Sequence, residues 1–487
     1  MKLSAMQIQA IVDATKTPTP EQVRVVEAPR RPLLVVAGAG SGKTETMSMR
    51  VLWLLANHPD LTPASILGLT FTRKAAGELG DRLRERIRLL SREMPQMRER
   101  LDEDPVALTY NSFAERIVSE HGMRIGIDPD FSMLSEAGAL DLMTQIVEAW
   151  PTDLDEELRP IDAVPQVLHL AGELAEHGFT VESAREALEE LGRELSQVGD
   201  TNAEARNLLR ANRRRLAFLG PIATYQQRKR EMGVLDFSDQ LVLATRIVRE
   251  APSVRAALRE EFRAVLLDEF QDTSVIQMEL LSTLFGDHAV TAVGDPNQAI
   301  YGWRGASASS LETFLDRFQS GAPEARQTLT LSTAWRNDVS ILDAANRVAA
   351  PLREVASYQQ GKDALKAQSP VLVPRKGAGQ GTVEIAYTQV YEDALAATVD
   401  FVKRVRSQAT KDGKRRTVAV LSRRRKDFPF IDAALREAGI PTEIVGLGGL
   451  LDQPAVQDVR AALELAYDVA ASPWLARLLA GIDLGAT

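Results

Sequence analysis

The sequence lacks cysteine altogether and contains few aromatic residues. Without a single cysteine among its 487 residues, the chain cannot form a disulfide, a thiolate zinc site, an iron–sulfur cluster or a cysteine nucleophile. Phe, Trp and Tyr together make up 5% of the sequence. An aromatic side chain in a loop is therefore a candidate for a binding role.

Long apolar runs are also missing, and neither charge sign dominates strongly. No run approaches the ~18 apolar residues of a membrane span, and residues 1–19 lack the pattern of a secretory signal. These absences, with that of cysteine, lead us to expect a cytoplasmic protein. The net charge of −9 argues against a uniformly basic nucleic-acid coat but allows a local basic groove, because binding depends on where charge sits.

Short apolar runs alternate with segments of helical pattern along most of the chain. Most of these runs are continuously apolar, which is typical of strands buried on both faces of a parallel sheet. We therefore predict an α/β fold with βαβ units. Strands are expected at 33–37, 66–72, 106–109, 264–268, 289–293, 328–331, 383–387, 417–421 and 442–445.

One long stretch, 111–232, has few strand-like runs and is rich in Ala, Leu, Glu and Arg. We interpret it as a helical subdomain inserted into a first α/β domain that comprises 1–110 and 233–325. A second α/β domain is expected at 326–470, followed by 471–487 as a tail or the start of another insertion. Within this frame, Asp236 with Asp239 three residues later is predicted to cap a helix.

A glycine-rich segment follows the first predicted strand and precedes a helical pattern. It consists of Ala37, Gly38, Ala39, Gly40, Ser41, Gly42, Lys43 and Thr44. Glycines let backbone N–H groups approach a phosphate, Lys43 is expected to reach the β- and γ-phosphates, and the Thr44 hydroxyl to ligate Mg²⁺. Ala37 replaces the usual first glycine of this pattern. The sequence thus predicts a site for ATP and Mg²⁺.

An apolar strand ends in two carboxylates, Asp268 and Glu269. At the end of a neighbouring strand they would face the phosphate loop, where Asp268 would hold Mg²⁺ and Glu269 would deprotonate the attacking water. The two segments are about 225 residues apart, and the inserted helical subdomain explains this separation.

The residues around these carboxylates carry a resemblance to a known family. The string Asp268-Glu269-Phe270-Gln271-Asp272-Thr273 resembles motif II of the superfamily 1 DNA helicases of the UvrD, Rep and PcrA class. Further strings resemble the glutamine motif and motifs Ia to IV, in family order, over about residues 17–465. They are Thr19-Pro20-Glu21-Gln22, Gly68-Leu69-Thr70-Phe71-Thr72-Arg73-Lys74, Thr109-Tyr110-Asn111-Ser112-Phe113, Val293-Gly294-Asp295-Pro296-Asn297-Gln298-Ala299-Ile300-Tyr301-Gly302-Trp303-Arg304 and Leu331-Ser332-Thr333-Ala334-Trp335-Arg336-Asn337.

The resemblance implies two RecA-like motor domains with ATP between them. Gln22 would read adenine and Trp335 would pack against it, while Gln298 would sense the γ-phosphate and Arg336 would act as an arginine finger. Phe71 and Trp303 would stack on DNA bases, which tolerates any sequence. The remaining DNA contacts would come from Thr72, Asn111, Tyr301 and Arg304.

The implied activity is ATP-driven, 3′→5′ movement on single-stranded DNA or at junctions, in repair or recombination. The sequence departs from the family pattern at Glu45 and Asn297, where the family usually has Arg and Asp, and at Asn111, usually His. The last family motifs are not found, so a missing C-terminal half or a partner subunit is expected. Two alternatives stay open: the helicase part of a RecB- or AdnAB-type helicase–nuclease, and an ATP- and DNA-binding module without unwinding activity.

Overall fold

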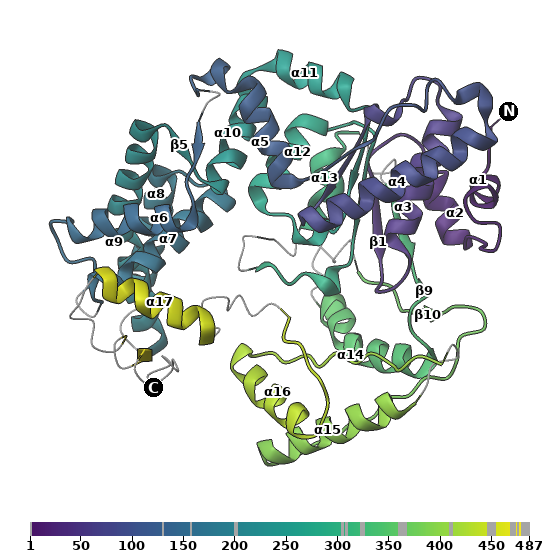
Figure 1. Cartoon of the computed structure of the whole chain (residues 1–487). Coiled ribbons are helices and arrows are strands. Elements are labelled where there is room, and N and C mark those ends of the chain that lie inside the picture. The colour runs from purple at the N-terminus through teal and green to yellow at the C-terminus, as the bar shows by residue number, and fades with distance from the viewer. Residues whose placement is uncertain are drawn as a thin grey trace. The chain divides into compact units, whose positions relative to one another are not determined.

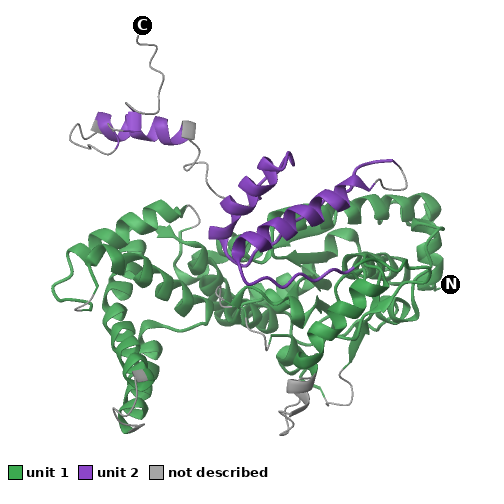
Figure 2. Ribbon diagram, turned by 90° about the horizontal axis from the view of Figure 1, so that it is seen from below, with its two compact units in different colours: residues 1–382 green, residues 383–487 purple. Residues whose placement is uncertain are grey.

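The computed structural model describes residues 2–128, 131–155, 158–198, 203–302, 306, 310–321, 327–358, 368–408, 413–445, 454–467, 474, 477 and 478 (Figure 1). The chain divides into two compact units, residues 1–382 and 383–487 (Figure 2). No helix within the described ranges is both long and apolar enough to cross a membrane.

A six-stranded, all-parallel sheet forms the centre of the first unit. Its strand order is β3-β2-β6-β7-β1-β8, and Val35 pairs with Val293 on one side and Leu329 on the other. The α/β class is confirmed, and the first six predicted strands are confirmed to within two residues. Their bounds are β1 Leu33–Ala37, β2 Ile66–Thr70, β3 Val106–Thr109, β6 Ala264–Leu267, β7 Val290–Gly294 and β8 Thr328–Leu331.

Helices cover both faces of this sheet, which explains the continuously apolar strands. Successive strand side chains point to opposite faces, so Leu34 and Val36 enter one buried core, whereas Leu33 and Val35 enter the other. The first core is closed by α5 Tyr110–His121, α10 Phe237–Glu250, α11 Pro252–Glu261, α12 Val275–Phe285 and α13 Ser310–Phe318. The second is closed by α1 Ala5–Val12, α2 Pro20–Val26, α3 Lys43–Asn57 and α4 Arg73–Glu93.

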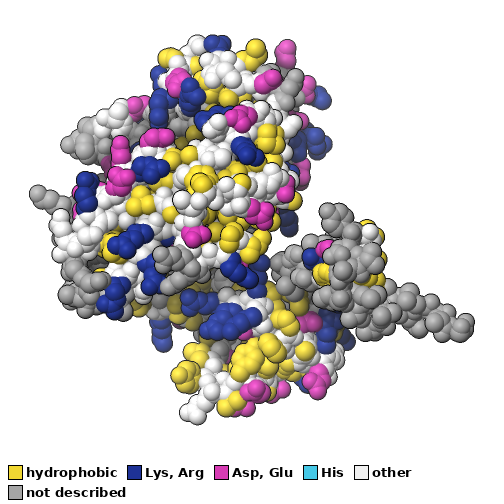
Figure 3. Space-filling view, turned by 90° about the vertical axis from the view of Figure 1, so that its left-hand side faces the viewer, with side chains coloured by type: hydrophobic (Ala, Val, Ile, Leu, Met, Phe, Trp, Pro, Cys, Tyr) yellow, Lys and Arg dark blue, Asp and Glu magenta, His cyan; other side chains and the backbone are white. Residues whose placement is uncertain are grey.

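A group of four helices has a hydrophobic core of its own. They are α6 Glu136–Glu148, α7 Pro160–Glu176, α8 Val181–Val198 and α9 Ala203–Met232. Two short strands, β4 Ser132–Met133 and β5 Val234–Leu235, pair where the chain enters and leaves this group. Figure 3 shows the side of the molecule that lies on the left in Figure 1, where these four helices are labelled. On that side, Lys and Arg side chains are scattered among apolar and acidic ones.

The predicted helix cap after this group is confirmed. Asp236 is the N-cap of α10, where its carboxylate accepts hydrogen bonds from the Ser238 and Asp239 backbone N–H groups. The Asp239 carboxylate in turn accepts from the Asp236 N–H, which completes a capping box. The Lys229 ammonium of α9 binds both carboxylates, at 2.5 and 2.7 Å. The cap therefore also ties the four-helix group to the sheet-flanking helix α10.

Beyond β8, helices alternate with irregular segments among the described residues. The first unit ends with β9 Thr333–Ala334, α14 Val339–Tyr358 and β10 Val373–Pro374, and the second unit contains α15 Tyr391–Ser407, α16 Phe428–Glu437 and α17 Pro454–Tyr467. Short 3₁₀ turns lie at Pro63–Ser65, Pro95–Met97, Gly122–Ile125, Phe270–Asp272, Pro296–Gln298 and Arg425–Asp427.

Three strands predicted in the second unit are wrong. Residues 383–387, 417–421 and 442–445 form no strand, and Ile385, Tyr387 and Leu421 are more than 90% exposed. An apolar run becomes a strand only when a neighbouring strand satisfies its backbone N–H and C=O groups. Sequence pattern alone reports the apolar run but not the missing neighbour.

Candidate nucleotide site

The phosphate loop joins β1 to α3, as the sequence predicts. Gly40 and Gly42 have φ angles of 73° and 83°, a left-handed conformation that glycine adopts without the usual steric cost. Gly42 is the N-cap of α3 and has no side chain to cap the first N–H groups, which leaves them for an anion. The hydroxyl of Ser41 is buried and finds no partner among the described residues. A loop with free donors and an unpaired hydroxyl fits a bound phosphate.

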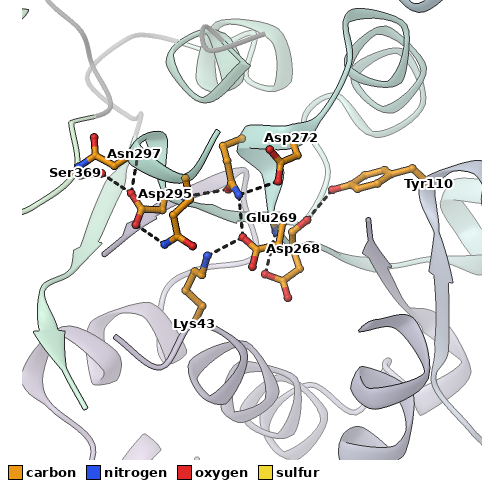
Figure 4. Close-up of polar contacts among 10 residues, drawn as sticks. Lys43, Tyr110, Asp268, Glu269, Asp272, Asp295, Asn297 and Ser369 are labelled. Carbon is orange, nitrogen blue, oxygen red and sulfur yellow. Dashed lines mark hydrogen bonds and ion pairs between the residues drawn. The ribbon is translucent and has the colours of Figure 1, made fainter. Parts of the chain in front are cut away.

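The predicted catalytic lysine and glutamate meet directly. Lys43 Nζ lies 2.7 Å from Glu269 Oε2 (Figure 4). Glu269 itself has φ 48°, an uncommon conformation for a residue with a side chain and one that often marks a functional site. The loop and the end of β6 thus face one another across the sheet edge, although the two residues are 226 positions apart.

Asp268 stands between the end of β6 and Glu269, and it is 8% exposed. Burial, and then the charge of Glu269, raise the pKa of Asp268 to about 6, although Lys43 acts in the opposite direction. Two adjacent carboxylates in a partly buried site favour a cation. Mg²⁺ usually takes one or two protein oxygens and completes its shell with water and substrate phosphates. Asp268 and Thr44, the second residue of α3, carry oxygen groups of the kind that such a site would use.

A chain of polar side chains extends from Glu269 towards the next strand. The Gln271 amide donates to Glu269 at 2.9 Å and to Asp272 at 3.2 Å, and its oxygen accepts the Asp295 N–H at 3.0 Å. Asp295 then accepts from the Gln298 amide at 2.6 Å. Figure 4 shows this network around Lys43 and Glu269. Gln298 is therefore linked to Glu269 through Gln271 and Asp295, two residues that sequence reasoning did not select.

Gln271 and Asp295 were missed although both stand inside the quoted strings. The available signal was that both polar side chains lie within four residues of the end of a buried strand. Such residues are common at strand ends, however, and only the tertiary structure shows that they bind each other.

The residues predicted at the adenine end also converge. A Cβ placed on Gly42 would lie 3.2 Å from Gln22 Nε2 and 3.6 Å from Trp335 Cδ1. The Gln22 oxygen accepts the Thr19 N–H in a capping box, so its amide nitrogen is the group directed to the site. The Trp335 N–H donates to the Gly40 carbonyl at 2.8 Å, and its ring is partly exposed.

Arg336 is next to the phosphate loop as well. Its Cβ would be 3.1 Å from a Cβ on Gly40, and its side chain is exposed. Glu21 holds this segment in place, because its carboxylate accepts from the Ser332 N–H and hydroxyl, both at 2.8 Å. The glutamine-bearing helix α2 is thereby fastened to the segment that carries Trp335 and Arg336.

The predicted DNA-contacting residues lie in part around a neighbouring cavity of about 760 Å³. Phe71 and Asn111 line it, and the Phe71 ring packs on Tyr301 with centroids 4.4 Å apart. Thr72 caps α4 by accepting the Ala75 N–H. Trp303 and Arg304 lie outside the described residues.

This cavity is connected to the nucleotide site by a buried tyrosine. The Tyr110 hydroxyl donates to the Asp268 carbonyl at 3.1 Å, and burial raises its pKa. The tyrosine hydroxyl therefore stays protonated and can keep donating. Tyr110 precedes Asn111, whose side chain accepts from the Gln277 amide, so one turn of α5 contacts both sites.

The glycine-rich loop, the predicted catalytic glutamate and the Phe71–Tyr301 pair thus share one sheet edge. Comparison with known families is consistent with this arrangement. The model of the UvrD/REP helicase N-terminal domain matches residues 18–319. The chain belongs to the UvrD/REP helicase family.

Two helicases of this family illustrate the extent of the similarity. The chain is 27% identical to DNA helicase II of Escherichia coli (strain K12) over 448 residues, which is 91% of this chain and 54% of that protein. It is 26% identical to the ATP-dependent DNA helicase PcrA of Staphylococcus aureus (strain Mu50 / ATCC 700699) over 454 residues, 91% of this chain and 53% of that one. The chain thus spans about half the length of these relatives.

Proposed function

We propose that this chain forms the ATP-hydrolysing part of a DNA helicase or translocase. The observation that carries the proposal is the contact between Lys43 and Glu269 at a phosphate loop, in a chain of the UvrD/REP helicase family. Hydrogen bonds connect the same glutamate through Gln271 to Asp295, and from Asp295 to Gln298.

The ion pair suggests how ATP would activate the glutamate. Lys43 is held by Glu269 in the structure, and an arriving γ-phosphate would compete for the ammonium group. Glu269 would then be free to accept a proton from the attacking water, while Arg336 would stabilise charge on the transferred phosphoryl group. Mg²⁺ on Thr44 and Asp268 would supply further charge neutralisation when bound.

Movement along DNA would use the cavity beside this site. At a centroid separation of 4.4 Å and an interplanar angle of 32°, the Phe71 and Tyr301 rings are already in contact, so a base would have to stack on the pair or separate it. Stacking contacts suit single-stranded DNA of any sequence. The finer assignment, 3′→5′ movement on single strands and junctions during cytoplasmic DNA repair or recombination, rests on the family resemblance.

ATP turnover with and without single-stranded DNA tests this proposal. The chain should hydrolyse ATP faster with DNA, and Glu269→Gln should lower turnover at least ~100-fold, as expected when a general base is lost, while nucleotide binding persists. Lys43→Ala is the matched control that should lose nucleotide binding. Binding of both ligands without stimulated turnover would favour an ATP- and DNA-binding module instead.

A further inference from the structure

Glu45, one of the three residues that depart from the family pattern, has a partner far along the chain. Its Oε2 lies 2.5 Å from Nη2 of Arg86 on α4, a residue 41 positions later. The side chains are 28% and 12% exposed. The pair is therefore partly buried, unlike most surface ion pairs, which are well hydrated and contribute little.

The pair lies at the adenine end of the proposed nucleotide site. The Cβ of Glu45 would be 3.8 Å from a Cβ on Gly42, the same point around which Gln22 and Trp335 converge. Glu45 is also the third residue of α3, so its carboxylate belongs to the helix turn whose N–H groups would receive phosphate.

Two electrostatic effects oppose each other at this position. An acidic residue in the first turn stabilises a helix, because the N-terminal end of the helix dipole is positive. The same positive end is what would attract a triphosphate, and a free carboxylate there would repel it. A neighbouring guanidinium removes that conflict by cancelling the carboxylate charge.

The surroundings of the pair increase the importance of this cancellation. Glu45 Oε1 and Arg86 Nη1 are buried and find no hydrogen-bond partner among the described residues. Among the described residues, the bond between the two groups is thus the side-chain hydrogen bond that each of them makes. Because water does not reach these two atoms, little solvent screening would replace a lost partner.

We propose that Arg86 is a positioning residue for the nucleotide, acting through Glu45. It neutralises the carboxylate and holds it aside, so the first turn of α3 keeps its positive potential for the triphosphate. This inference rests on the proposed nucleotide site.

A double-mutant cycle tests this role through equilibrium titration with fluorescent ADP and a fluorescent, non-hydrolysable ATP analogue. Arg86→Met should weaken ATP-analogue binding on the order of 5- to 10-fold, and ADP binding less, because the triphosphate carries more negative charge. Glu45→Gln should bind the ATP analogue at least as tightly as the parent chain, because it removes the carboxylate and keeps the positive charge of Arg86. The double variant should return to within about twofold of the parent chain, since it no longer contains the repelling carboxylate.

Rescue by Glu45→Gln separates this role from a purely structural one, because loss of packing at Arg86 would not be repaired by removing a charge at Glu45. Equal weakening in Arg86→Met and in the double variant would overturn the proposal, as would unchanged binding in Arg86→Met. If Arg86→Met does not fold, the charge-swapped pair Glu45→Arg with Arg86→Glu replaces it. That pair should bind the analogue at least as tightly as the parent, and clearly weaker binding would overturn the proposal.

The controls distinguish this proposal from the proposed function. A parent chain that binds neither nucleotide, or a Lys43→Ala variant that still binds both, would contradict the nucleotide site itself. Normal nucleotide binding in the parent chain with no effect at Arg86 would contradict only the role of the ion pair.

Discussion

Arg50→Met is expected to destabilise the first unit strongly, because Arg50 is 1% exposed and closes the end of helix α2. Its guanidinium donates to the carbonyls of Val25, Val26, Ala28 and Pro29 and to the Thr291 hydroxyl, at 2.9 to 3.3 Å. All these acceptors are neutral, and the carbonyls lie at the negative end of the α2 dipole, which favours a cation.

The size of the effect follows from these acceptors. The carbonyls of Val25 and Pro29 also accept backbone N–H groups, whereas among the described residues the carbonyls of Val26 and Ala28 accept from Arg50 alone. Each orphaned buried acceptor costs about 1–3 kcal/mol, and methionine removes the desolvation cost of a buried cation. The two orphaned carbonyls together cost about 2–6 kcal/mol. Because the removed desolvation cost offsets part of this, we expect a net loss of about 2–4 kcal/mol.

Urea unfolding followed by circular dichroism measures this loss, with Arg50→Lys as the matched variant. Lysine keeps the charge but places all its donors on one nitrogen, so it should recover only part of the stability. Burial lowers the pKa of Arg50 to about 10, so folded and unfolded chains both carry the charge at neutral pH. The difference between variants should therefore be constant from about pH 6 to 9. A loss below about 1 kcal/mol for Arg50→Met would refute this reasoning.

Two further predictions concern the proposed DNA contact of Tyr301 and the pH dependence of folding. Tyr301→Ala should weaken single-stranded DNA binding by about 1–3 kcal/mol, the value of one stacked base, whereas Tyr301→Phe keeps the ring and should bind nearly as well in fluorescence anisotropy. Equal affinities for all three proteins would remove Tyr301 from the DNA site. The Nε2 of His288 lies 2.7 Å from the Phe262 carbonyl, and burial lowers the pKa of this histidine in the folded chain. As the pH falls, the unfolded chain therefore takes up a proton at His288 before the folded chain does. The free energy of unfolding should consequently decrease below about pH 6.5. His288→Gln should show a shallower decrease between pH 7 and 5 in thermal unfolding, and an unchanged slope would contradict this assignment.

Some features of the fold were predictable because their causes are local. A strand buried on both faces has to be apolar at every position, so the run 33–37 identifies β1 without knowledge of its neighbours. The phosphate loop needs glycines next to a strand and a helix, and the cap at Asp236 needs a partner only three residues away. In each case the interacting groups are close in the sequence, and residue type is enough to indicate them.

The functional roles assigned to the site residues stay predictions, but their placement together could be anticipated in part. The ends of parallel strands meet at one sheet edge, which is why Lys43 and Glu269 could be expected to face each other. The helix cap at Thr72 and the packing of Phe71 on Tyr301 could not be foreseen, because a threonine or an aromatic residue in a loop has several possible partners.

The sequence by itself therefore determined the class of fold, the six strands of the main sheet and the candidate phosphate site. Only the tertiary structure decided which distant groups bind each other. Arg50 meets Thr291 across 241 positions, Glu45 meets Arg86 on another helix, and Gln271 joins two strand ends. It also decided that apolar runs such as 383–387 remain unpaired. Ion pairs, hydrogen bonds and strand ladders each need a second group, and the chain's path through space determines where that group lies.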